Sequence, residues 1–204
     1  VDAENFRIQK FDSSGVYVTK WGTPGTGDGQ FNTPVGITRD ASGNVYVTEE
    51  GDRVQKFDSS GTFLSKFGSL GSSNGQFNDP RGIALDSYGN IYVADRQNHR
   101  IQKFNSSGNF VSKIGYDTSG SSDSQFITPS GVAISTTSQY MYVTDRNNHR
   151  VQRFLYVPYP ISTTSPATSV DQNTATLNAN LLDLGTTTVT QHGFVYGTSS
   201  DLSI

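Results

Sequence analysis

Short apolar runs separated by turn residues make up the stretch between residues 80 and 115. The run at 91–94 is apolar at every position, which predicts a strand whose two faces are both covered. The run at 109–114 alternates apolar and polar residues, as an outer strand does when one of its faces meets water. Both runs have the length of a β-strand and neither has the spacing of a helix, so the stretch predicts a sheet.

Two further runs complete this predicted sheet. The run at 82–85 is short and starts with Gly82, which predicts an innermost strand that allows close approach of another backbone. The run at 100–104 has its apolar residues three apart, which does not fit the two-residue period of a strand. We therefore expect a bulge or a half-exposed face in this third strand.

The same pattern recurs along the chain with a regular period. Arginines at equivalent positions lie 46, 47 and 50 residues apart: Arg7, Arg53, Arg100 and Arg150. A second landmark, Gln-Phe followed by Pro-x-Gly, keeps this period at 30–36, 76–82 and 125–131. Such a period belongs to repeat architectures. Because no long segment has helical periodicity, we predict an all-β fold, a partial β-propeller of four-stranded antiparallel blades.

Composition narrows the class of protein. The 204 residues include 21 glycines, and 33% are hydrophobic, which is typical of a turn-rich globular β protein. The formal net charge of −3 gives the chain no overall attraction for nucleic acid or an anionic membrane. Cysteine is absent, which excludes disulfides and thiolate catalysis but leaves the compartment open. The sequence contains no apolar stretch long enough to span a bilayer.

Three motifs occur together in the repeats: Pro-x-Gly-(Ile/Val)-Ala, Gly-Asn-(Val/Ile)-Tyr-Val-(Ala/Thr)-Asp and Asn-His-Arg-(Ile/Val)-Gln. In this combination residues 80–104 and 129–154 resemble the NHL repeat, and residues 34–57 resemble it with departures such as Thr48-Glu49 in place of Ala-Asp. The resemblance implies a β-propeller, commonly of six blades, whereas this chain holds about three and a half. We therefore expect either further blades in the parent protein or self-association with another copy that completes the ring.

The end of the blade pattern defines the predicted domains. We assign residues 1–157 to the NHL-type propeller segment, with a blade tail at 1–22 and repeats at about 34–68, 80–115 and 129–156. Residues 158–170 are rich in Pro, Ser and Thr and predict an extended linker.

Residues 171–204 form a third predicted segment. Alternating runs at 174–181 and 189–197 predict strands. The segment is similar to the opening strands of the immunoglobulin-like (Ig-like) or fibronectin-type-III-like (FN3-like) modules of prokaryotic surface proteins. A sandwich of this kind needs about seven strands, so we expect this module to be truncated.

Blade geometry localises the candidate functional residues. In a propeller, the connections between second and third strands and those between blades open on one face, which we call the open face. We expect polar residues on this face to be ligand-binding candidates: Glu49, Glu50, Arg81, Asp95, Arg96, Asn98, His99, Asp145, Arg146, Asn148 and His149. We assign no catalytic residue, because no Ser-His-Asp triad can be identified from spacing.

His99 and His149 occupy equivalent positions in adjacent repeats. Imidazoles supported by carboxylates such as Asp95 and Asp145 are common zinc ligands, and some NHL-type propellers are zinc lyases, so both histidines are candidate metal ligands. A residue that recurs with the blade period is more often structural, and hydrogen-bonds its own loop or the next blade. We therefore expect a structural role for both histidines, and no metal or cofactor.

The charged residues also have two interpretations. We expect Arg100 and Arg150 to form ion pairs with Asp95 and Asp145 that brace loops or adjoining blades. Three other arginines are less well explained by the repeat and could present cations to a ligand or to an RNA backbone, as in some NHL domains: Arg81, Arg96 and Arg146.

These observations lead to three functional hypotheses. The first is a non-catalytic binding or scaffold module of a secreted or cell-surface modular protein, which recognises a protein or glycan through the open face. The second is part of a metal-dependent propeller lyase or hydrolase. The third is an RNA-binding NHL domain, against which the net charge argues.

Overall fold

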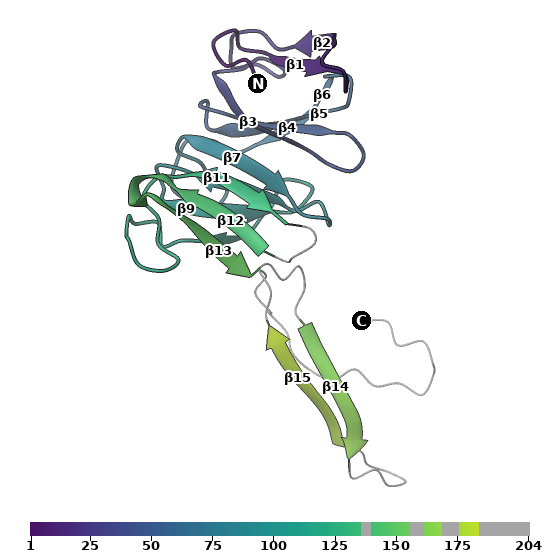
Figure 1. Cartoon of the computed structure of the whole chain (residues 1–204), viewed down its shortest axis with the longest axis vertical. Helices are drawn as coiled ribbons and strands as arrows, with labels where there is room; N and C mark the ends of the chain where they lie inside the picture. Colours follow the sequence, from purple (N-terminus) through teal and green to yellow (C-terminus); the bar gives the residue numbers. More distant parts are fainter. Residues whose placement is uncertain (136–139, 156–160, 169–175, 184–204) are drawn as a thin grey trace. The chain divides into compact units, whose positions relative to one another are not determined.

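The computed structural model describes residues 1–135, 140–155, 161–168 and 176–183. These residues form β-strands joined by turns and one short 3-10 helix, η1 (Arg146–Asn148). The chain divides into two compact units, Val1–Tyr156 and Val157–Ile204 (Figure 1). Among the described residues, no helix has the length and apolar character needed to cross a membrane.

The first unit consists of four consecutive antiparallel sheets, which we call blades 1 to 4 (Figure 1). Blade 1 contains β1 (Ile8–Phe11) and β2 (Tyr17–Trp21). Blade 2 contains β3 (Pro34–Arg39), β4 (Val45–Glu49), β5 (Arg53–Phe57) and β6 (Phe63–Phe67). Blade 3 contains β7 (Pro80–Leu85), β8 (Ile91–Asp95), β9 (Arg100–Phe104) and β10 (Phe110–Ile114). Blade 4 contains β11 (Pro129–Ile134), β12 (Tyr140–Asp145) and β13 (Arg150–Leu155).

The predicted all-β fold of four-stranded antiparallel blades is confirmed. In blades 2 and 3 the strands pair in sequence order, so that β3 and β7 lie at one edge of their sheets and β6 and β10 at the other. β9 has the predicted bounds, and β7 begins two residues earlier than predicted, at Pro80. Proline is tolerated at the first position of a strand, where its missing N–H breaks no ladder.

The prediction for the third strand was wrong. β9 is buried at all five positions and is not half-exposed. The irregularity in its pairing lies on the neighbouring strand, where the register shifts between Phe110 and Ser112 of β10. Two of the polar residues that disturb the two-residue period of β9, Arg100 and Gln102, are hydrogen-bonded to the buried carboxylate of Asp95.

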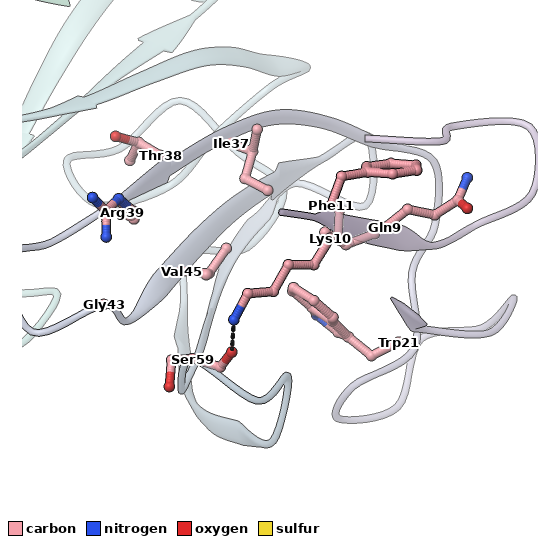
Figure 2. Close-up of a pocket in the computed structure, with 11 residues that line it drawn as sticks. Gln9, Lys10, Phe11, Trp21, Ile37, Thr38, Arg39, Gly43, Val45 and Ser59 are labelled. Atoms are coloured by element: carbon pink, nitrogen blue, oxygen red, sulfur yellow. Dashed lines mark hydrogen bonds between the residues drawn. The ribbon is translucent and has the colours of Figure 1, made fainter. Parts of the chain in front are cut away.

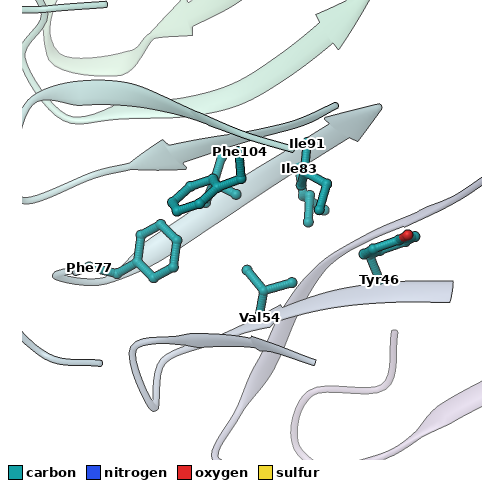
Figure 3. Close-up of a cluster of buried hydrophobic side chains, with 7 residues drawn as sticks. Tyr46, Val54, Phe77, Ile83, Ile91 and Phe104 are labelled. Atoms are coloured by element: carbon teal, nitrogen blue, oxygen red, sulfur yellow. The ribbon is translucent and has the colours of Figure 1, made fainter. Parts of the chain in front are cut away.

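The core is a series of apolar clusters between neighbouring blades. Tyr46 and Val54 of blade 2 pack against Ile83 and Phe104 of blade 3 and against Phe77 of the loop before β7 (Figure 3). The rings of Phe77 and Phe104 lie 5.4 Å apart between centroids, within the range of favourable aromatic pairs. Similar clusters join blade 1 to blade 2 and blade 3 to blade 4. Each blade is therefore stabilised mainly by its neighbours.

The first strands of blades 2, 3 and 4 lie next to one another. β7 lies between β3 and β11 (Figure 1). A Cβ atom added to Gly82 of β7 would lie 2.7 Å from Ser130 O and 2.8 Å from Gly131 Cα of β11. The predicted close backbone approach at Gly82 is therefore present.

The two faces of blade 4 differ in burial. The alternating pattern of β12 and β13 leaves one face uncovered among the described residues, whereas β8 and β9 of blade 3 are buried throughout. Val151 of β13 is 61% exposed, while the equivalent Val54 of β5 is 0% exposed. Position in the stack, rather than sequence, sets this difference.

The second unit contains a two-stranded antiparallel sheet of β14 (Ile161–Thr168) and β15 (Thr176–Asp183). β14 falls within the linker predicted over 158–170, so this part of the chain forms a strand. β15 overlaps the run predicted at 174–181. The strand predicted at 189–197 lies outside the described residues.

Candidate functional site

The connections inside the blades meet the connections between blades. The turn after β8 contacts the loop that leads into β7, because Asn98 Nδ2 donates a hydrogen bond to Gly71 O at 2.8 Å. The equivalent bond in blade 4 runs from Asn148 Nδ2 to Gly120 O at 2.9 Å. These connections form the open face, and the candidate residues lie on or beneath it.

Asp95, at the end of β8, has a side chain that is not exposed at all. Its carboxylate accepts hydrogen bonds from Arg100 Nε at 2.8 Å, from Asn98 Nδ2 and Gln102 Nε2 at 2.9 Å each, and from Asn78 N–H at 2.8 Å. Buried polar groups are tolerated when they are hydrogen-bonded in this way. This network explains how Arg100 and Gln102 of β9 can be buried.

An acidic residue, an arginine and a glutamine hold the same arrangement in the other blades: Asp2 with Arg7 and Gln9, Glu49 with Arg53 and Gln55, and Asp145 with Arg150 and Gln152. Sequence reasoning missed the glutamines, although they recur with the blade period. Since the arrangement is repeated in every blade, it is a structural element of the repeat. The candidates Glu49, Asp95, Asn98, Asp145 and Asn148 all belong to it.

The arginine of the network braces a loop. Arg100, whose side chain is fully buried, donates hydrogen bonds to Ser72 O at 2.8 Å, Ser73 O at 2.9 Å and Gln76 O at 3.0 Å. Arg150 makes the equivalent bonds in blade 4. The expected ion pairs of Arg100 and Arg150 with Asp95 and Asp145 are present, and they hold loops rather than a ligand.

The environments of Asp95 and Asp145 shift their pKa values in opposite directions. Burial raises the pKa of Asp95, despite the hydrogen bonds that its carboxylate accepts. Burial also acts to raise the pKa of Asp145, but hydrogen bonds from Asn148, the Ile127 N–H and Arg150 outweigh it and lower the pKa. The same repeated network is therefore accompanied by pKa shifts of opposite direction in blades 3 and 4.

His99 links blade 3 to blade 4. Its backbone has φ of 54°, and its Nδ1 accepts a hydrogen bond from Thr128 N–H, the residue before β11, at 3.2 Å. In the preceding blade, Asp52 has φ of 58° and Oδ1 accepts from Asp79 N–H at 2.8 Å. A histidine and an aspartate thus perform the same structural task at equivalent positions. The contact supports the structural role expected for His99.

His149 holds the same position in blade 4, with φ of 52°, and its side chain is exposed. The carboxylates expected to support metal binding, Asp95 and Asp145, are directed to the asparagine, arginine and glutamine of their own networks. In the ranges that the structure describes, no three His, Asp or Glu side chains gather as metal ligands. Asp95 and Asp145 are therefore not placed to support a metal ion at His99 or His149.

The junction of blades 2 and 3 carries charges that the repeat does not explain. Arg81 contacts Glu50 Oε1 through Nη2 at 2.9 Å and Asp79 Oδ1 through Nε at 2.7 Å. Arg96 Nη1 donates to Asp79 Oδ2 at 2.7 Å. Two of the arginines considered for RNA binding are therefore ion-paired with carboxylates, which weakens that hypothesis. Arg146 of blade 4 is exposed.

A cavity of about 270 Å³ lies at this junction, lined by Glu50, Asp52, Asn78, Asp79 and Arg81. Burial raises the pKa of Asp52, and the nearby charges of Asp79 and Glu50 raise it further, although Asp52 also accepts the Asp79 N–H. The cavity is therefore lined by three carboxyl groups and one guanidinium, that of Arg81, which pairs with Glu50 and Asp79.

The next junction has different chemistry at the same repeat positions. Arg96, His99, Thr128 and Ser130 stand where Glu50, Asp52, Asp79 and Arg81 stand one blade earlier. The open face thus has a structural layer that repeats and an outer layer that varies. Asp52 and Asp79 were not among the predicted site residues, although a position-by-position comparison of the repeats could have identified them.

Comparison with known proteins extends this picture. Residues 77–104 and 126–154 match the NHL repeat family, and these ranges contain the two segments in which the resemblance was strongest. Residues 34–57 lie outside the matched ranges. No curated protein is significantly similar to the chain.

Solved structures share the fold. A protein of unknown function from Bacteroides thetaiotaomicron aligns with 75% of this chain and 42% of its own, at 16% identity and a TM-score of 0.61. A streptogramin B lyase aligns with 82% of this chain and 53% of its own, at 15% identity and a TM-score of 0.51. Virginiamycin B lyase from Staphylococcus aureus aligns with 77% of this chain and 51% of its own, at 17% identity and a TM-score of 0.51.

The chain spans about half the length of these structures. At this level of identity the likeness concerns the fold alone, since one fold carries many functions. The matches do not support the predicted Ig-like or FN3-like module. The repeated polar network, the stacked blades and the matched segments together show that this chain carries NHL repeats in a partial β-propeller.

Proposed function

We propose that the protein is a non-catalytic binding module that recognises a protein or glycan through the open face, at the junction of blades 2 and 3. The supporting observation is the cavity lined by Glu50, Asp52, Asp79 and Arg81, where charged side chains depart from the repeat. Residues that vary on a repeated scaffold are those that ligand recognition can use without loss of the fold.

The charge arrangement defines the kind of ligand. Glu50 is exposed, and its ion pair with Arg81 lies at the rim of the cavity, where water weakens it. A ligand with its own cationic and hydrogen-bonding groups could replace that pair at small cost. Such groups are common in polypeptides and amino sugars, so we place both among the candidate ligands of a secreted or cell-surface protein.

A binding screen with matched variants tests this proposal. The chain is screened on a glycan array and against a displayed peptide library, and the best ligands are measured again with Glu50→Gln and Arg81→Ala. We expect both variants to weaken binding at least tenfold. Lys20→Ala, which removes an exposed cation from β2 of blade 1, is the control and should bind normally. Equal affinity for wild type and both junction variants would reject the proposed site.

The lyase hypothesis predicts different results. Native mass spectrometry of the chain, purified without chelator and then incubated with zinc, would show one tightly bound ion per chain or per assembly if a metal site exists. Turnover of a selected ligand would also favour an enzyme. A chain without metal that binds but does not convert its ligand is the result that the binding proposal predicts.

A further inference from the structure

The junction of blades 2 and 3 shows where this fold places a carboxylate between two cations. Asp79, the residue before β7, has φ of 58°. Its carboxylate contacts Arg81 Nε and Arg96 Nη1 at 2.7 Å each. A carboxylate paired with guanidinium groups in this way is a strong, charge-assisted arrangement. We call the place of the Asp79 carboxyl group the acid position of the repeat.

Thr128 holds the equivalent place before β11, at the junction of blades 3 and 4. Its φ of 54° is nearly that of Asp79. The η1 turn lies beside it, since Asn147 N–H donates a hydrogen bond to Ile127 O at 3.1 Å. The equivalent bond in blade 3 runs from Gln97 N–H to Asn78 O at 3.0 Å. The backbone therefore reproduces the acid position at this junction, but the side chain there carries no carboxyl group.

Arg146 loses its acidic partner through this change. It is the first residue of η1 and stands where Arg96 stands in blade 3. Arg96 pairs with Asp79 of its own blade, whereas no ion pair of Arg146 occurs among the residues that the structure describes. Since both positions of the pair lie within one blade, the difference arises inside blade 4 and involves no further blade.

Two more hydrogen-bond donors lie at this junction. His99 Nδ1 accepts the Thr128 N–H at 3.2 Å, so the neutral imidazole carries its proton on Nε2 and can donate there. The hydroxyl oxygen of Thr128 is buried and makes no hydrogen bond within the described ranges. Buried polar groups nearly always have a partner, so this hydroxyl favours a hydrogen-bonding group that comes from outside the chain.

The buried carboxylates beneath the junction do not neutralise Arg146. Asp95 and Asp145 each pair with the arginine of their own network, at 2.8 and 2.9 Å. The cation of Arg146 and the two donors beside it therefore remain available to an anionic group.

We propose that the junction of blades 3 and 4 binds the carboxylate of an aspartate or glutamate side chain on another polypeptide. The carboxylate takes the acid position and accepts hydrogen bonds from the Arg146 guanidinium, from His99 Nε2 and from the Thr128 hydroxyl. The preceding junction supports this class of ligand, because an aspartate of the chain itself holds the acid position there. The site differs in place and in charge from the cavity between blades 2 and 3, so the result for one does not decide the other.

A capped tripeptide, acetyl-Gly-Glu-Gly-amide, is the probe, and its Gln counterpart is the matched control. NMR titration of the whole chain follows the imidazole resonances of His99 and the Nε–H of Arg146. We expect saturable shifts at both residues with the Glu peptide, and at least tenfold weaker binding of the Gln peptide. Glucuronate and inorganic phosphate are titrated in parallel. Tighter binding of either than of the Glu peptide would overturn the assignment to a polypeptide.

Thr128→Asp tests the acid position directly, because it recreates in blade 4 the pair that Asp79 and Arg96 form in blade 3. Aspartate tolerates positive φ better than threonine does, so the variant should keep the wild-type unfolding midpoint. We expect its own carboxylate to exclude that of the Glu peptide and to weaken binding at least tenfold. Thr128→Val keeps the side-chain shape, removes only the unpartnered hydroxyl, and should bind several-fold more weakly without loss of stability.

Arg146→Gln removes the cation and should also weaken binding of the Glu peptide at least tenfold. Arg39→Gln is its matched control and should bind normally, since Arg39 is an exposed arginine on β3 of blade 2, next to Thr38 (Figure 2). Absent binding, equal binding of the Glu and Gln peptides, or normal binding by Arg146→Gln or by folded Thr128→Asp would each overturn the proposal.

Discussion

At the scale of single residues, the position held by Asp52 and His99 shows how one structural task can be met by different chemistry. Both residues have positive φ and both accept the N–H of the residue before the next blade. The task requires only an acceptor at the right place. The charge of the residue at this position can therefore vary. In blade 2 it is Asp52, whose carboxyl group lines the cavity at the junction of blades 2 and 3.

Asp52→Asn should stabilise the protein at neutral pH. Because burial and the charges of Asp79 and Glu50 raise the pKa of Asp52, its ionisation costs stability that is regained as pH falls through the folded-state pKa. Asparagine keeps the acceptor and tolerates positive φ. We expect Asp52→Asn to be more stable than wild type at pH 7 and this gain to disappear near pH 3, measured by urea unfolding at both pH values.

Asp58→Asn is the control for this prediction. Hydrogen bonds from Ser60 and Thr62 lower the pKa of Asp58, so its ionisation favours the folded state above the unfolded-state pKa and this contribution is lost in acid. Its replacement should have the opposite sign at pH 7. If both variants change stability in the same direction, the electrostatic explanation for Asp52 is wrong.

Which polar residues are buried could not be predicted from the sequence. The period of the repeat correctly placed Asp95, Asn98 and Asp145 near the open face, but spacing does not distinguish an exposed carboxylate from a buried one with four donors. The donors of Asp95 come from three separate turns or strands. These donors come together only in the folded protein. From the sequence, the carboxylates therefore looked available to a ligand.

At the scale of elements, apolar patterning identified the strands well because each strand is short and bounded by turn residues. The run at 91–94 is buried on both faces, as its composition predicted. The third strand was misjudged since Arg100, Gln102 and Lys103 are polar yet buried in β9. Local pattern reports side-chain polarity, whereas burial also depends on hydrogen-bond partners from other elements.

Gly82→Ala should destabilise the protein strongly. The added Cβ would lie 2.7 Å from Ser130 O and 2.8 Å from Gly131 Cα, both in the backbone of β11, so the inner strands would have to separate. We expect a loss of more than about 2 kcal/mol in the free energy of unfolding, within the range of overpacked sites.

Gly15→Ala separates this effect from backbone strain. Gly15 has φ of 81° and no heavy atom within 4 Å of an added Cβ, so its replacement carries the conformational cost alone. That cost is about 1 kcal/mol. Comparable losses in the two variants would show that β7 and β11 are not in close contact.

At the scale of the whole molecule, stability depends on the order of the blades. The apolar clusters join consecutive blades, and blades 2 and 3 each contribute to the cluster on either side. Repeat proteins of this kind are stabilised by contacts between neighbours, so an end blade has less support than an inner one. The exposed face of β12 and β13 agrees with this rule, since no described blade covers it.

Two identical substitutions measure the difference between inner and end blades. Val54→Ala removes a side chain that is fully buried between blades 2 and 3, and should cost about 2 kcal/mol. Val151→Ala changes the equivalent, exposed residue of blade 4 and should stay within about 0.5 kcal/mol of wild type.

Thermal and urea unfolding of both variants provide the comparison, and sedimentation at several protein concentrations accompanies them. Equal losses would mean that Val151 is covered in solution. If the Val151→Ala loss grew with protein concentration, the cover would be another copy of the chain, as the self-association hypothesis predicts.

The bonds by which Arg100 holds its loop end on the carbonyl oxygens of Ser72, Ser73 and Gln76, and not on their side chains. A carbonyl oxygen is present at every residue, so these anchors place few demands on the identity of the exposed loop residues. The exposed residues of this loop can therefore be substituted, by natural or laboratory selection, without loss of the hydrogen bonds that hold the loop to the blade. The sequences of the open-face loops can thus vary while the network beneath them stays the same.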